Sequence, residues 1–243
     1  MRGKGVKSER KRLGRKEKMT EEERRLNAAE ETEKRLAEWI PKTTAGKMVK
    51  NGEIESLDQF FERNLNVMEP EIVDMLLPDL EEKLVDFHKT AKVRRSGRQF
   101  SFRATVLVGD KNSYIGVGTG KDRERFPATR KAARNAKLNL VKVRKGCGSW
   151  QCGCQETHSI PFKVSGKSSS VRVVLLPAPK GTELVVGNNI KDVMILSGIK
   201  DVWSKSSGNT GSKLDFVAAT IDALRNTTKK RLSEDIVKQA TRK

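Results

Sequence analysis

The sequence lacks the features that mark several common classes of protein. It has no run of 18 apolar residues, so we expect no membrane-spanning helix. Met1 to Lys4 lead into charged residues rather than an apolar core, so we expect no secretory signal. The chain has only two histidines, and it shows no HExxH motif, nucleophile elbow or suitably placed carboxylate pair. The sequence therefore argues against a membrane-spanning protein, a secreted protein and an enzyme.

Cysteine is also scarce, and its three copies crowd together at Cys147, Cys152 and Cys154. An odd, clustered set does not suggest a disulfide framework and indicates a reducing, intracellular compartment. With His158 the spacing is C-x4-C-x-C-x3-H, and four such soft ligands could close a tetrahedral zinc site. The usual C-x2-C pair is missing, so free thiols in a glycine-rich loop are the alternative. A structural zinc ion is the one cofactor that the sequence suggests.

Positive charge is abundant and unevenly distributed. The formal net charge is +19 and the isoelectric point is about 10, which indicates a polyanionic partner, above all a nucleic acid. Residues 51–91 hold 3 basic and 11 acidic residues, whereas residues 92–145 hold 16 and 3. The acidic segment is either a packing element or, as we favour, a surface for protein contact, because its charge would repel RNA.

A strand is expected at the start of the most basic segment. Apolar residues from Phe100 to Val108 alternate with polar ones, which predicts a strand with one face toward a core. Arg103 lies on the polar face of this pattern. A turn at residues 109–112 and a second strand at residues 114–117 should follow.

A helix is expected over residues 128–143, with Pro127 in its first turn. Its alanines and Leu140 should face the sheet, and Arg130, Arg134 and Lys137 should lie on the opposite side. Between strand and helix we expect a glycine-rich loop around Gly118, Gly120 and Lys121. Neither the Walker nor the Rossmann spacing is met, so these glycines indicate close backbone approach to RNA or plain turn chemistry.

The flanking segments have weaker but readable patterns. Before the basic segment we expect a basic tail at residues 1–19, a helix from Thr20 to about residue 39, a basic linker at 46–52, short helices beginning at Ser56 and Pro70, a strand at 84–93 and a basic hairpin loop at 94–98. After it we expect strands at 160–164 and 171–175 joined by a turn at 165–168, a stiff loop at 177–182, a helix capped by Asn188 or Asn189, a short strand at 201–204 and an amphipathic helix from about Leu214.

The basic side chains of the central segment are the predicted RNA contacts. They are Arg94, Arg95, Arg98, Arg103, Lys121, Arg123, Arg125, Arg130, Lys131, Arg134 and Lys137. A run of charge is usually a solvated surface, but sixteen cations against three acids within 54 residues is unusual. Phosphate contacts from such a surface would make RNA binding strongly dependent on salt. His88, in the first strand, is expected to be structural or to face RNA.

The order β-β-β-α with a cationic last helix resembles the double-stranded RNA-binding domain, which reads A-form RNA through phosphates and 2′-hydroxyls. Several segments together resemble one family, small ribosomal subunit protein five in its archaeal and eukaryotic branch. The segments are Trp39–Thr43, Glu69–Asp74, Leu76–Leu80, Phe102–Ala104, Val108–Asp110, Gly116–Gly118, Arg130–Leu140, Cys147–Trp150, His158–Pro161, Val171–Val173, Leu176–Thr182 and Ala219–Leu224. Their order and spacing make the resemblance specific.

The resemblance implies an α+β fold. It implies a double-stranded-RNA-binding-like domain at residues 84–146, a Cys/Gly linker loop at 147–157 and an α/β domain with a left-handed crossover at 158–227. An extension at 1–83 and a basic tail at 228–243 flank them. The resemblance also implies a non-enzymatic constituent of the cytoplasmic ribosome that binds small-subunit rRNA. Its neighbours would include small-subunit protein four near the mRNA entry path, with a part in decoding accuracy.

Two other functions compete with this hypothesis. A free-standing RNA-binding module of a regulator or processing complex could use the same basic β-β-β-α unit. An RNA-processing enzyme is a third hypothesis, against which the missing acid–base residues argue.

Overall fold

The computed structural model describes residues 36–63, 65–154 and 156–229. The chain divides into two units, residues 1–42 and 43–243, and only residues 36–42 of the first are described. The predicted tail at 1–19, nearly all of the predicted helix from Thr20 and the end of the basic C-terminal tail lie outside the described residues.

Three short helices open the second unit: α3 (Thr44–Lys50), α4 (Leu57–Glu62) and α5 (Pro70–Leu76). The Thr43 and Ser56 hydroxyls accept hydrogen bonds from backbone N–H groups in the first turns of α3 and α4. The helices at Ser56 and Pro70 are as predicted. The prediction of a basic linker at 46–52 is wrong, because the Thr43 cap and the buried Ala45 and Val49 support a helix there.

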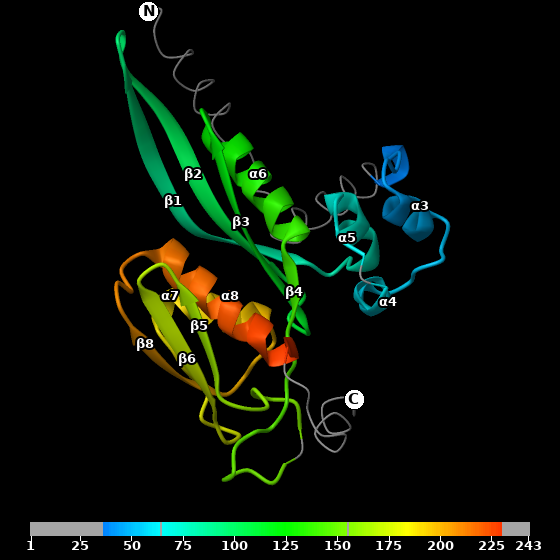
Figure 1. The fold of residues 1–243 in the computed structure, drawn as a ribbon, viewed down its shortest axis with the longest axis vertical. Coiled ribbons are helices and arrows are strands. Elements are labelled where there is room, and N and C mark those ends of the chain that lie inside the picture. Colours follow the sequence, from blue (N-terminus) through cyan, green and yellow to red (C-terminus); the bar gives the residue numbers. More distant parts are fainter. Residues whose placement is uncertain (1–35, 64, 155, 230–243) are drawn as a thin grey trace, which may run out of the picture. The chain divides into compact units, whose positions relative to one another are not determined.

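The first sheet is antiparallel, in the order β1-β2-β3-β4, and carries one helix (Figure 1). Its elements are β1 (Glu81–Arg94), β2 (Gly97–Gly109), β3 (Tyr114–Asp122), α6 (Arg125–Leu138) and β4 (Leu140–Lys142). Two predictions fail: the expected loop at 118–121 is the second half of β3, and the helix ends at Leu138. Leu140 therefore lies in the fourth strand, which pairs with β3, rather than on the helix.

Alternate glycines of β3 let α6 lie directly on the strand. A Cβ added at Gly116, Gly118 or Gly120 would come within 2.3 Å of a carbonyl oxygen of α6. The helix presents small residues at this contact, among them Ala132 and Ala136, both fully buried. The prediction that these glycines serve approach to RNA or a turn is thus wrong, since the backbone that they admit is that of α6.

The second sheet has the strand order β5-β6-β8-β7, with β7 parallel to β8. Its elements are β5 (Val164–Ser168), β6 (Val171–Pro177), β7 (Leu184–Val185), α7 (Asn188–Leu196), β8 (Val202–Ser207) and α8 (Lys213–Lys229). The predicted turn at 165–168 is wrong, because β5 occupies it and the chain turns at Ser169 and Ser170 instead. Gly187, rather than either asparagine, occupies the N-cap of α7.

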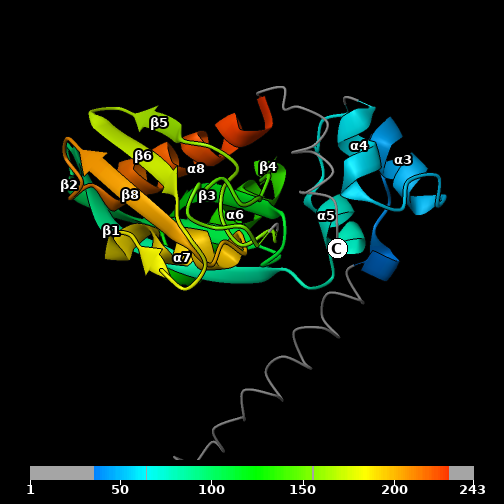
Figure 2. The ribbon, with the colours of Figure 1, turned by 90° about the horizontal axis from the view of Figure 1, so that it is seen from below.

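The two sheets share one hydrophobic core. Helix α8 packs on β5 and β6, and both α7 and α8 also contact strands of the first sheet, so the two helices lie between the sheets (Figures 1 and 2). Leu107 of β2 and Ile115 of β3 belong to the same buried cluster as Ile190 and Val217 of these helices. The fold is α+β, as predicted, but β2 is buried on both faces over its inner half.

Among the helices of the described ranges, none is both long and apolar enough to cross a membrane.

Candidate RNA-binding surface and candidate metal site

The β1–β2 hairpin extends beyond the rest of the first sheet. The register of β3 on β2 ends at Phe102–Asp122, so residues 90–94 and 97–101 form a two-stranded arm (Figure 1). The predicted loop at 94–98 is the tip of this arm, with Arg95 and Ser96 in the turn and Gly97 at a φ of +114°. The arm therefore carries three exposed arginines away from the core, Arg94, Arg95 and Arg98.

A groove at the arm tip brings together cations from two parts of the sequence. Its lining is Arg94, Ser96, Gly97, Arg98, Gln99 and Arg123. Arg123 comes from the short segment between β3 and α6, so the tertiary structure gathers side chains separated by about 25 positions in the chain. Guanidinium groups in such a groove suit the bidentate binding of phosphate.

Aromatic rings support the arm at its base. Phe87 and Phe102 stack with centroids 5.4 Å apart, and the Arg125 guanidinium lies over both, 5.6 and 5.5 Å from their centroids. Farther out, Lys89 Nζ lies 3.8 Å from the centroid of Phe100. The prediction that Phe100 faces a core is wrong, because the ring is 47% exposed where α6 no longer covers β2.

A second basic groove runs between α6 and β3. Its lining is Met68, Pro70, Thr119, Gly120, Lys121, Lys131, Arg134, Asn135 and Leu138. Lys131 Nζ lies 2.6 Å from Asp122 Oδ2, and Arg134 lies 3.8 Å from Glu71 Oε1. The hydrogen bond from Lys131 lowers the pKa of the Asp122 carboxyl. Both cations remain more than half exposed, so these weak surface pairs leave them accessible to phosphate.

Lys137 does not belong to this exposed surface, contrary to prediction. Its side chain is 10% exposed, and Nζ lies 2.8 Å from Asp74 Oδ1 and 3.0 Å from Glu82 Oε1. Burial acts to lower the pKa of Lys137, but the hydrogen bonds and charges of the two carboxylates outweigh it and raise that pKa. Lys137 thus fastens α6 to α5 and β1.

The other predicted RNA contacts lie at the surface. Those that are exposed are Arg94, Arg95, Arg98, Lys121, Arg123, Arg125, Arg130, Lys131 and Arg134, and Arg103 is half-buried. His88 is also exposed on β1, with Nε2 2.7 Å from the buried Asp86 carboxylate.

The acidic segment packs on its own chain, so the first of the two predicted roles, a packing element, is observed, and contact with another protein stays a prediction. Lys142 Nζ lies 2.6 Å from Asp58 Oδ1, and the Tyr114 hydroxyl donates a hydrogen bond to the same oxygen. Burial, and then Asp58, raise the pKa of the Tyr114 hydroxyl. Together with the pairs of Glu71 and Asp74, these contacts fasten α4 and α5 to the first sheet and α6.

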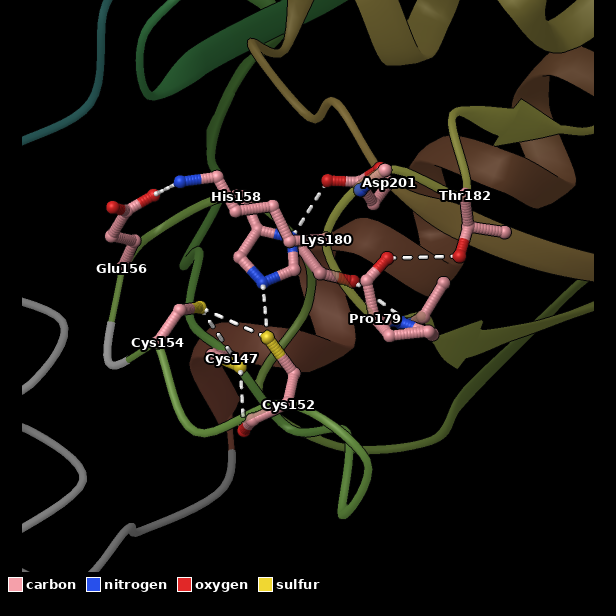
Figure 3. A network of polar contacts seen from close by, with 12 residues as sticks. Cys147, Cys152, Cys154, Glu156, His158, Pro179, Lys180, Thr182 and Asp201 are labelled. Carbon is pink, nitrogen blue, oxygen red and sulfur yellow. Dashed lines mark hydrogen bonds and ion pairs between the residues drawn. The ribbon is translucent and has the colours of Figure 1, made fainter.

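The three cysteines and His158 meet at one point (Figure 3). Their ligand atoms all lie within 4.8 Å of one another, with Cys152 Sγ 3.1 Å from Cys154 Sγ and 3.7 Å from His158 Nε2. Cys147 Sγ lies 3.6 Å from Cys154 Sγ. The structure thus brings all four predicted ligands together, in an arrangement compatible with a metal ion.

A short backbone bridge positions this cluster. Gly146 and Ser159 exchange N–H···O hydrogen bonds of 2.9 and 3.0 Å, which hold the residues next to Cys147 and His158 side by side. His158 is buried, and its Nδ1 lies 2.8 Å from Asp201 Oδ2 at the start of β8. Asp201 is a member of this network that the sequence did not reveal, because no spacing rule links it to residues more than forty positions away.

The thiols of the cluster influence one another strongly. Burial, followed by the neighbouring thiols, raises the pKa of Cys147 to about 12. The backbone N–H of Lys180, followed by hydrogen bonds from Cys154, lowers the pKa of Cys152 to about 6. The crowding of the sulfurs therefore acts against ionisation of Cys147, and a cation among them would favour it.

Two basic grooves on an α+β fold are typical of a nucleic-acid-binding protein. Comparison with known proteins places the chain more narrowly. Residues 80–144 match the family described as "Ribosomal protein S5, N-terminal domain", and residues 166–239 match "Ribosomal protein S5, C-terminal domain". The chain belongs to the ribosomal protein S5 family.

Full-length relatives agree. The chain is 54% identical over 194 residues to the "Small ribosomal subunit protein uS5" of Staphylothermus marinus. The matched region covers 80% of this chain and 91% of the relative. It is 52% identical to that of Methanocaldococcus jannaschii (79% and 88% covered) and 51% identical to that of Methanobrevibacter smithii (84% and 96% covered). The predicted family is confirmed, and the relatives are structural, non-enzymatic ribosomal proteins. Binding of rRNA and a role in translation follow from the family.

Proposed function

We propose that this chain binds small-subunit rRNA with the arm-tip groove, the α6–β3 groove and the exposed cations between them. The observation that carries the proposal is that six cations from distant parts of the chain line these two grooves. Arg94, Arg98 and Arg123 line the arm-tip groove, and Lys121, Lys131 and Arg134 line the α6–β3 groove. The proposed contacts are Arg94, Arg95, Arg98, Arg103, Lys121, Arg123, Arg125, Arg130, Lys131 and Arg134. Lys137 is left out because its carboxylate partners occupy it.

The proposed mechanism is positional rather than chemical. Phosphate contacts fix where a protein lies on RNA but read no sequence, so the surface would clamp rRNA helices by shape. The arm contributes reach and the shared core contributes rigidity, because residues of both sheets lie in one buried cluster. Groups near the arm tip and in the α6–β3 groove would thus hold a fixed spacing.

The finer features of the function rest on the family resemblance. We propose that the chain works in the cytoplasmic ribosome, beside small-subunit protein four and other ribosomal proteins, where it supports the mRNA entry path and decoding accuracy. The division into an extension at 1–83, an RNA-binding half at 84–146, a linker loop at 147–157, a C-terminal half at 158–227 and a tail at 228–243 is part of the same proposal. We also propose a structural zinc ion as cofactor, with no part in RNA contact.

Sedimentation of a tagged chain with ribosomal subunits tests the proposal. Cells would express the wild-type chain or one of two charge variants, and lysates would be run on sucrose gradients at moderate and high salt. Arg94→Gln with Arg95→Gln and Arg98→Gln removes the arm-tip cations. Lys167→Gln with Arg172→Gln removes exposed cations from the second sheet and is the control.

We expect the wild-type chain and the control to stay with the small subunit at both salts, and the arm variant to dissociate at high salt. Each lost phosphate contact should reduce the salt slope of RNA binding by about 0.9. Wild-type chain at the top of the gradient would favour the free-standing RNA-binding module. Equal retention of the arm variant and the control would overturn the assignment of the arm.

A further inference from the structure

The linker between the two sheets contains a constellation that RNA binding does not use. Three thiols and a buried imidazole converge on one point, and a carboxylate stands behind the imidazole (Figure 3). The geometry points to a structural zinc site with ligands Cys147, Cys152, Cys154 and His158, in which Asp201 is the outer partner that positions His158 and couples the metal to the loop before β7. This inference rests on the zinc cofactor of the proposed function.

The spacing of the ligand atoms suits a tetrahedral ion. With Zn–S bonds of about 2.3 Å and Zn–N bonds of about 2.0 Å, two sulfurs in a tetrahedron lie about 3.8 Å apart and a sulfur and a nitrogen about 3.5 Å apart. The Cys147–Cys154 sulfur distance is 3.6 Å and the Cys152–His158 distance is 3.7 Å. The Cys152–Cys154 pair, at 3.1 Å, would need to open by about 0.7 Å to reach that spacing.

The chemistry of the ligands also fits zinc. Three thiolates and one imidazole form a Cys3His set, which closes a structural site and leaves no open position for catalysis. A dication at their centre would neutralise the charge of the three thiolates that ligate it. His158 is buried, so it is held in place rather than free to turn away.

Asp201 sets the orientation of the imidazole. Its Oδ2 can only accept from Nδ1 at 2.8 Å, so the neutral ring carries its proton there and presents the Nε2 lone pair to the sulfurs. This carboxylate–histidine–metal arrangement recurs in metal sites, and loss of the outer partner usually weakens metal binding 10- to 100-fold.

The same carboxylate connects the site to the loop before β7. Asp201 Oδ1 accepts hydrogen bonds from the backbone N–H groups of Gly181 (3.1 Å) and Glu183 (2.9 Å). Both residues have positive φ, +90° at Gly181 and +59° at Glu183. This conformation is sterically unfavourable for the non-glycine Glu183, and the hydrogen bonds to Asp201 offset that cost. Metal, imidazole, carboxylate and loop thus form one chain of contacts, so removal of the metal should loosen residues 179–183 as well as the cysteine loop.

Metal content of the purified full chain tests the ligand set. We expect about one zinc per chain by mass spectrometry, released by a thiol-specific mercurial, and tetrahedral thiolate-to-cobalt absorption after replacement by Co²⁺. Cys147→Ser and Cys154→Ser should abolish the cobalt spectrum, whereas His88→Gln, which alters the exposed histidine, should leave it unchanged. Metal-free wild-type chain whose three thiols react equally fast with and without added zinc would overturn the site.

Asp201→Asn tests the outer partner separately, with Asp222→Asn as the control. We expect Asp201→Asn to bind zinc 10- to 100-fold more weakly in competition with a chelator, with the cobalt spectrum still formed at saturation. Hydrogen exchange at residues 179–183 should rise in this variant and in chelated wild-type chain. Unchanged affinity and exchange would overturn the role of Asp201 and leave the zinc site standing. The arm-tip variant should keep its zinc, which separates this result from failure of the RNA-binding proposal.

Discussion

The two ends of the β1–β2 hairpin differ in what surrounds them, although the strands are continuous. At the inner end, β2 lies between α6 on one face and α7 on the other, and Ala104, Leu107 and Val108 are fully buried. At the outer end none of the helices in the described part of the chain covers the strands, and Phe100 and three arginines are exposed. The comparison shows that one secondary-structure element can contribute to the core at one end and present exposed cations, our proposed RNA contacts, at the other.

The charges of α6 show the same division within one helix. Lys137 is buried between two carboxylates, whereas Arg130, two turns earlier, is exposed. Periodicity alone places both residues on one side, but α5 and β1 cover the end of the helix where Lys137 lies. The cations of one helix therefore divide into a buried, ion-paired residue and exposed residues that are our proposed RNA contacts.

The largest expected effect is at the inner end, from Gly118→Ala. The new Cβ would meet the Ala132 carbonyl oxygen and the Ala136 nitrogen at 2.2 Å, and neither backbone atom can turn aside. We expect a loss of at least about 3 kcal/mol in the free energy of unfolding, measured by urea denaturation. Gly97→Ala at the arm tip meets no atom within 4 Å and should cost only about 1 kcal/mol, through its positive φ. Equal losses would contradict the division between the two ends.

Lys137→Met and Arg130→Met should separate stability from RNA binding. Lys137→Met leaves Asp74 and Glu82 without their cation and should cost about 2 kcal/mol of folding free energy, with the salt slope of RNA binding unchanged. Arg130→Met should change stability by less than about 0.5 kcal/mol and reduce the slope by about 0.9. A slope that falls in the Lys137 variant would place that residue back among the RNA contacts.

Asp58, in helix α4 of the acidic segment, should make a small contribution to the stability of the fold that is lost at acid pH. Burial raises the pKa of Asp58, but hydrogen bonds from Lys142 and Tyr114 outweigh it and leave the pKa below its usual value. The carboxylate thus stabilises the fold above pH 3.8, and this stabilisation is lost as the pH falls through the lowered pKa. Because the side chain is half exposed, we expect Asp58→Asn to lower the free energy of unfolding by at most about 1 kcal/mol. This loss should appear only at pH values at which the wild-type carboxyl is ionised.

Denaturation curves at several pH values would check this dependence. Asp79→Asn, at an exposed position of the same segment, is the matched control and should leave the pH dependence of stability unchanged. An Asp58 variant with the same pH dependence as wild type would show that the contacts of Asp58 with Lys142 and Tyr114 do not contribute to stability.

The smallest effect is expected on the arm itself. Lys89→Ala removes the cation over the Phe100 ring and should cost about 0.5 kcal/mol, detectable as faster hydrogen exchange in residues 90–101. Lys92→Ala, in the same strand, should leave exchange unchanged. Slower exchange in the Lys89 variant would mean that this contact does not stabilise the arm.

Local patterns in the sequence predicted the individual elements well. Alternation marked β2 and β6, the residues Ser56 and Pro70 marked the starts of two helices, and the turn at Asp110 lies where expected. Failures came where a local signal has two meanings. Glycines that suggest a loop also suit a strand under a helix, and Thr43 caps a helix that its basic composition made look like a linker.

The sequence by itself determined the family, the strongly basic character and the set of three cysteines and one histidine that we propose as metal ligands, because each depends on residue type and short spacing. Only the tertiary structure decided that Lys137 is buried, that the acidic helices pair with the same chain, and that Asp201 stands behind His158. These outcomes depend on contacts between residues far apart in the sequence, and burial and pairing energies arise only when the fold brings such residues together.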